Sequence, residues 1–227
     1  MILLRDELES VIEKFGPPAK AEVVDEKGVA SLSPLLPSDL VGFFAKYGVG
    51  MWLKGKFQFC RSDLYDRVCQ SVLNGDVEFR PEESAIFGFT AFGEVFIWNR
   101  EHKALVQVKL ARQIATTNPY TRTSQHPELA ITDVLRFIDK NFTDLREDTP
   151  EAPLLFARAV KKLGELELGQ VYGFAPALAL GGSATIDRLF KMNALEHLAF
   201  LAQLRPARLM NYKDGREEFI RVLGPSS

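Results

Sequence analysis

The sequence predicts an α+β protein, with an antiparallel sheet flanked by helices and a mainly helical C-terminal domain. Apolar residues recur at helical spacing in several segments, residues 86–110 read as three consecutive strands, and the spacing beyond residue 154 is again helical. We expect a first part at residues 1–147 and a second at 154–227. The chain has 227 residues and is 46% hydrophobic. It can therefore bury a core without disulfides or metal.

The helices of the first part are predicted from apolar residues spaced three or four apart. Residues 4–15 should form an amphipathic helix that stops at Gly16-Pro17-Pro18, and a second helix should begin near Ser38 and end at Gly48. Two further helices are expected at residues 64–73 and 131–142. The apolar positions of these four helices are Leu4, Leu8, Val11, Ile12 and Phe15; Leu40, Phe43, Phe44 and Tyr47; Leu64, Val68, Val72 and Leu73; and Ile131, Val134, Leu135, Ile138 and Phe142.

The strands should lie between these helices. Residues 52–59 alternate around a glycine turn, which indicates a hairpin or two short strands. Residues 86–92, 94–98 and 104–110 predict an antiparallel meander. In the last of these runs every second residue is apolar, so we expect helices to cover one face of the sheet.

The boundary between the two parts is predicted from residues 146–153, which are charged and contain two prolines. Beyond it, helices are expected around residues 156–163, 186–190 and 195–202, with an extended segment at 171–176. The second part could be a separate domain or could pack into one body with the first.

The charge balance argues against binding to nucleic acid or membrane. The net charge is −2, without the basic excess of a nucleic-acid binder. Residues 1–84 carry 10 basic and 14 acidic side chains, so this third could attract a basic protein partner, or could be an ordinary solvated surface. No segment reaches the roughly 18 apolar residues of a membrane span, and the N-terminus lacks the basic, apolar pattern of a signal peptide. We expect a cytoplasmic protein.

No catalytic or metal-binding pattern stands out. His102, His126 and His197 are scattered and have no metal-ligand neighbour at helical spacing. Cys60 and Cys69 lack the paired spacing of a zinc site and are expected to be buried thiols. We therefore expect no enzyme, no cofactor and no metal, although a dispersed active site is left open. A Gly181-Gly182 turn before a predicted helix could bind an anion, but a capped turn is favoured.

Two stretches of the sequence resemble known families. The first comprises residues 15–18, 36–40, 47–48 and 55–59, and it resembles the GAD-like domain; residues 90–98 look like the strand-turn-strand that commonly follows it. The second comprises Lys162-Leu163-Gly164, residues 171–182 and Glu196-His197-Leu198, and it resembles the C-terminal domain of type VI secretion immunity proteins. Together the two stretches cover most of the chain.

The resemblance implies an immunity protein that neutralises a toxin delivered between bacteria. Members with this two-part layout are typically paired with DNase toxins, so the expected partner is a cognate nuclease. Because a nuclease needs a basic groove for phosphates, an inhibitor can compete for that groove with carboxylates. The candidate toxin-binding acids are Asp63, Asp66, Asp76, Glu78, Glu82 and Glu83. A cytoplasmic adaptor or regulatory module without a toxin partner is the alternative.

Overall fold

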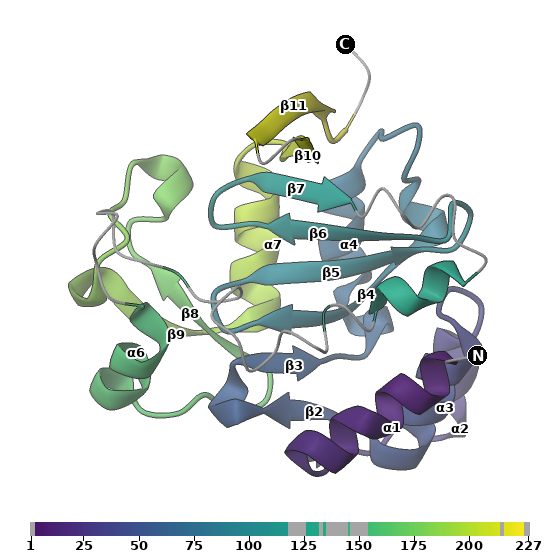
Figure 1. Cartoon of the computed structure of the whole chain (residues 1–227). Helices are drawn as coiled ribbons and strands as arrows, with labels where there is room; N and C mark the ends of the chain where they lie inside the picture. Colours follow the sequence, from purple (N-terminus) through teal and green to yellow (C-terminus); the bar gives the residue numbers. More distant parts are fainter. Residues whose placement is uncertain are drawn as a thin grey trace.

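The computed structural model describes residues 3–117, 126–131, 134, 145, 154–213 and 216–224. Its centre is a nine-stranded, mostly antiparallel sheet with helices on both faces (Figure 1). The strand order is β1-β2-β3-β4-β5-β6-β7-β10-β11. The bounds are β1 Ala19–Glu22, β2 Val49–Trp52, β3 Phe57–Phe59, β4 Ser84–Thr90, β5 Glu94–Asn99, β6 Ala104–Lys109, β7 Ile114–Thr117, β10 Arg208–Lys213 and β11 Arg216–Val222.

The N-terminal helices confirm the predicted capping signals. Helix α1 spans Leu4–Phe15 and stops at Gly16, whose φ of 77° few other residues adopt readily. Helix α3 spans Ser38–Tyr47 and stops in the same way at Gly48. Helix α2, Glu26–Leu32, was not predicted; it is short, and the Asp25 side chain caps it by accepting the N–H of Gly28.

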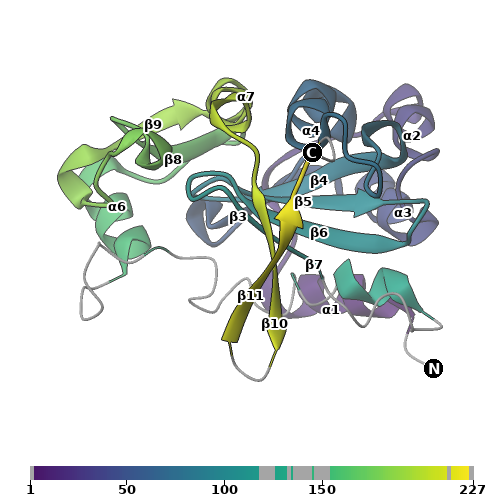
Figure 2. The ribbon, with the colours of Figure 1, turned by 90° about the horizontal axis from the view of Figure 1, so that it is seen from above.

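Helices cover both faces of the sheet. The alternation of apolar and polar residues at 104–110 had predicted helices on one face. On one face α1 and α3 pack over an aromatic layer that includes Phe59, Phe87 and Trp98. On the other face α4, Asp66–Leu73, packs beside α7, Ala194–Leu204, over strands β4 to β6. The two views show these helices in separate layers on either side of the sheet (Figures 1 and 2).

The prediction of a mainly helical C-terminal domain is wrong. After α6, Leu155–Leu163, the chain forms the two-stranded sheet of β8, Gln170–Phe174, and β9, Leu189–Asn193. Residues 186–190 have helical apolar spacing, but they form a 3-10 turn followed by the start of β9. The charged strands β10 and β11 were missed entirely. Apolar and polar residues do not alternate regularly in these strands. The hairpin is joined to the sheet by pairing of β10 with β7, a strand about 90 residues earlier in the chain.

The C-terminal strands complete the main sheet. Strand β10 pairs in parallel with β7, and β11 pairs antiparallel with β10 to form the last strand of the sheet. Figure 2 shows this hairpin projecting toward the side on which α1 lies. Most of the predicted boundary, and much of the predicted helix at 131–142, lies outside the described residues, so the division into 1–147 and 154–227 stays a prediction.

Two buried glutamines attach the C-terminal part to the sheet. On β3, the Gln58 Nε2 donates to the carbonyl of Gln170 at 2.8 Å, and its Oε1 accepts the N–H of Gly169 at 2.9 Å. Before β7, the Gln113 Nε2 donates to the carbonyl of Leu201 on α7 at 2.8 Å. Both side chains are buried, so water cannot reach their amide groups, and these hydrogen bonds supply the partners instead. These hydrogen bonds therefore join the C-terminal part directly to the sheet and to the segment before β7.

Candidate functional site

The six acids singled out in the sequence do not form one open acidic surface. Asp63 lies beside Arg61, which donates to it from Nε at 3.2 Å and from Nη2 at 2.7 Å. Asp66 is exposed in the first turn of α4, where partial burial and then the nearby Asp63 raise its pKa. A raised pKa reflects an environment that disfavours the charged carboxylate.

Asp76 is a buried structural residue. Its side chain has no exposed area, and it accepts hydrogen bonds from the N–H groups of Phe79 at 2.8 Å and Gly224 at 3.0 Å. Arg221 on β11 donates both to Asp76 and to Glu78, the latter at 2.9 Å. Burial alone would raise the pKa of Asp76, but Arg221 and the two amides outweigh it and hold the pKa below its usual value. Asp76 and Glu78 therefore anchor the last strand of the sheet.

Glu82 and Glu83 lie in a mixed-charge cluster before β4. Arg100 donates to Glu83 at 2.6 Å, while the guanidinium of Arg80 lies 3.9 Å from Glu82 and 2.9 Å from Glu101. These cations offset much of the negative field of the carboxylates. Among the six predicted acids, only Asp76 is buried; Asp63, Asp66, Glu78, Glu82 and Glu83 lie at or near the surface, and Glu78 is held there by Arg221.

The histidines and cysteines were the other candidate reactive side chains. His126 Nδ1 lies 3.4 Å from a Glu128 carboxylate oxygen. His197 on α7 packs against Gly173 of β8, and burial lowers its pKa. Cys60 and Cys69 are buried, as predicted, and burial raises the pKa of the Cys69 thiol to about 12. In the part of the chain that the structure describes, no group of three or more His, Cys, Asp or Glu side chains could hold a metal ion.

One surface feature was not predicted. A groove of about 520 Å³ lies between α1 and α3, and Gly42 lies at its edge in the middle of α3. The signal in the sequence is that glycine, because glycine is unfavourable inside a helix unless something requires it.

Comparison with known proteins assigns both parts of the chain. Residues 6–112 match the GAD-like domain, and residues 137–205 match the C-terminal domain of the T6SS immunity protein Tdi1. The chain is thus similar to the GAD-like domain in its N-terminal part and to the Tdi1 immunity domain in its C-terminal part. This confirms the resemblance seen in the sequence, and the second match supports an immunity role.

A solved structure supports the arrangement of the whole molecule. The crystal structure of Atu4351 from Agrobacterium tumefaciens is similar with a TM-score of 0.87 and 26% sequence identity, over 95% of this chain and 97% of that chain. No curated protein gives a significant match. Among the described residues, no helix is long and apolar enough to cross a membrane.

The two matched domains meet at the glutamine contacts. The GAD-like domain supplies Gln58, and the immunity domain supplies Gln170, Gly169 and Leu201. Strands β7, β10 and β11 lie outside both matched ranges, although β10 and β11 finish the sheet that the GAD-like domain begins.

Proposed function

We propose that the protein is an immunity protein that binds a cognate type VI secretion toxin, a DNase, and neutralises it by direct protein contact. The observation that carries the proposal is the match of residues 137–205 to the Tdi1 immunity domain. The DNase assignment rests on the two-part layout, which resembles that of immunity proteins paired with DNase toxins. Under this proposal the protein is not an enzyme and needs no cofactor.

Co-expression with the toxin encoded beside its gene tests this function. Toxin alone should degrade the DNA of the host cell, and the full-length chain should restore survival. The purified complex should be inactive as a nuclease, and activity should return when the partners are separated. A toxin that neither binds the chain nor loses activity in its presence would show that the proposal is wrong.

The contact surface on this proposal includes the acids that remain accessible. Asp63, Asp66, Glu82 and Glu83 can approach a basic nuclease groove, whereas Asp76 and Glu78 are engaged by Arg221. Since most of these acids have cationic neighbours, we expect them to act at the rim of the interface. Rim charges act mainly on the association rate and its salt dependence.

Reversing two of these charges tests their role. The double variant Asp66→Lys, Glu82→Lys should slow association with the toxin several-fold at low salt, because it replaces attraction to a basic groove with repulsion. Stopped-flow or surface-binding kinetics at two salt concentrations would measure this. Glu218→Lys on the exposed part of β11 is a matched charge control. Equal association rates for wild type and the double variant at low salt would refute electrostatic attraction by these acids.

A further inference from the structure

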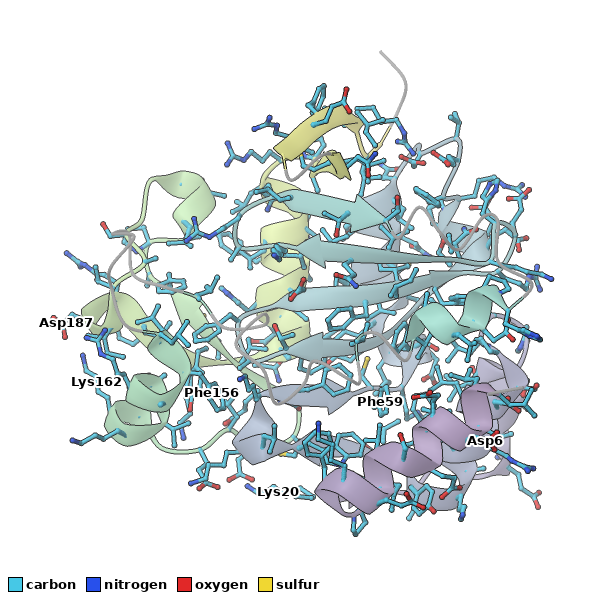
Figure 3. All side chains as sticks on the ribbon, viewed as in Figure 1. Asp6, Lys20, Phe59, Phe156, Lys162 and Asp187 are labelled. Carbon is cyan, nitrogen blue, oxygen red and sulfur yellow. The ribbon has the colours of Figure 1, made fainter. Side chains whose placement is uncertain are left out.

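The groove between α1 and α3, here called the α1–α3 groove, has an apolar floor and a charged rim. Leu8 and Phe43 are buried members of the core beneath it. The other lining residues are Arg5, Asp6, Glu9, Ser38, Asp39, Gly42 and Lys46. Figure 3 labels Asp6 on α1, at the end of the molecule where this helix begins. Leu8 and Phe43 expose only 1% and 4% of their surface, so the groove offers hydrocarbon at its base mainly through the open space at Gly42, with carboxylate acceptors at its rim.

Packing does not require a glycine at position 42, which lines the α1–α3 groove. It lies in the interior of α3, and a Cβ atom added there would meet no heavy atom within 4 Å. No neighbouring helix or strand thus requires a glycine at this position, although glycine is the poorest helix former apart from proline. The residue is exposed, so what it leaves open is space at the surface beside Phe43.

The charges of the α1–α3 groove favour a cationic occupant. Lys46 is already paired with Glu9 at 2.8 Å. Asp39 accepts the backbone N–H of Arg5 at 3.2 Å, and Asp6 accepts that of Leu3 at 3.3 Å, in each case through Oδ2. Of the two cations in the groove lining, Lys46 is paired with Glu9, so Arg5 is the one that remains opposite Asp6 and Asp39. The groove lining therefore has a net charge of −1, and α1 alone carries −2.

An arginine fits both properties of the α1–α3 groove. Its aliphatic stem can lie in the open space beside Gly42 while its guanidinium reaches the carboxylates at the rim. The planar guanidinium binds carboxylates through two parallel hydrogen bonds, packs on aromatic rings and loses less hydration than an ammonium group. A lysine would match the charge but not these contacts.

We propose that the α1–α3 groove binds an arginine side chain on the surface of the cognate toxin. The inference rests on the proposed function, because the partner is the toxin that the protein neutralises. It assigns part of the toxin contact to α1 and α3, in the same matched domain as the acids of residues 63–83 but on different elements. Arginine is among the side chains most often found as interface anchors, which sit in pockets of this kind.

Larger side chains at position 42 would fill the α1–α3 groove, and measuring both Kd and Tm of these variants distinguishes an effect on toxin binding from an effect on folding. Gly42→Leu occupies the space with hydrocarbon, and Gly42→Arg supplies a guanidinium from the protein itself. Both should raise the Kd for a catalytically inactivated toxin by roughly tenfold or more. Gly42→Ala should raise Tm by roughly 2–4 °C, as expected for a glycine replaced in an exposed helix, and neither larger variant should lower it. Ala45→Leu, on the exposed side of the same helix and outside the groove lining, should bind as wild type.

A double-mutant cycle identifies the occupant. Surface arginines of the toxin are changed to alanine one at a time, and one of them should lose its effect when combined with Gly42→Arg. Asp39→Asn keeps an oxygen that can accept the N–H of Arg5. It should weaken binding of the wild-type toxin, but it should not weaken binding of the toxin variant that lacks the coupled arginine.

Three outcomes would overturn the inference. Wild-type affinity of Gly42→Leu and Gly42→Arg would show that the α1–α3 groove is not a contact. Weakened binding without coupling to any toxin arginine would show that the occupant is wrong. If wild-type protein neither binds nor protects against the toxin, the proposed function fails as well. If wild-type protein protects and the Gly42 variants bind the toxin equally well, the groove inference is wrong but the proposed immunity function is not.

Discussion

A single buried carboxylate illustrates what sequence reasoning could not see. Asp76 follows Gly75 in a polar segment, which favours an exposed loop acid. The structure instead buries it against Arg221, 145 residues later in the chain. Local pattern contains no information about a partner at that distance. Asp63 and Glu83, by contrast, stay near the surface, and the sequence also could not show that Arg61 and Arg100 would pair with them.

Removing the carboxylate of Asp76 should destabilise the protein strongly. Asp76→Ala leaves Arg221 and the N–H groups of Phe79 and Gly224 without their acceptor, so we expect a loss of about 3–5 kcal/mol in the free energy of unfolding. Urea denaturation would measure it. Exposed Glu82, changed to alanine, is the control and should cost less than about 0.5 kcal/mol.

The lowered pKa of Asp76 also predicts a pH dependence. Because the folded pKa lies below the unfolded value, the stabilisation is complete above about pH 4 and is lost as pH falls through the folded pKa. Asp76→Asn should therefore flatten the stability profile below pH 4. An unchanged acid limb in this variant would mean that other carboxylates control acid unfolding.

The separate elements were predicted with uneven success. Helices α1 and α3 were found because their stop signals, Gly16 and Gly48, are local and their apolar spacing is regular. The meander of β4, β5 and β6 was found for the same reason, since its strands are joined by short turns. Only the start of strand β9 was predicted as helix, because Ile186, Leu189 and Phe190 have helical spacing. The α1–α3 groove went unnoticed because a single helix carries only half of it.

The contacts between elements give a prediction about the C-terminal part. Gln58→Ala should cost about 1–3 kcal/mol, because the N–H of Gly169 and the carbonyl of Gln170 each lose a buried partner. Hydrogen exchange should rise first in β8 and β9, which this side chain ties to β3. The exposed Gln203, whose amide bonds only within α7, serves as the control when changed to alanine. Uniform exchange across the molecule would argue against a local attachment role.

At the scale of the whole molecule, the sequence predicted an antiparallel sheet with helices on one face, but neither the helices on its other face nor the two strands that end the sheet. The predicted fold class is wrong in its mainly helical C-terminal domain, because that part of the chain contributes strands β8, β9, β10 and β11. The parallel pairing of β10 with β7 joins segments whose own patterns are weak, so it depends on tertiary contacts. The resemblance to two families identified both domains, while neither matched range includes the strands that finish the sheet.

That order of strands has a consequence for synthesis. Strand β7 ends at Thr117, but its outer neighbour β10 begins only at Arg208. At translation rates of about 5–20 residues per second, the β7 edge stays unpaired for roughly 5–20 s on the ribosome. Arg221, the cation for Asp76, emerges later still. The nascent chain therefore carries an open sheet edge until β10 is made, and an acid without its cation until Arg221 is made. This is the interval in which chaperones would protect it.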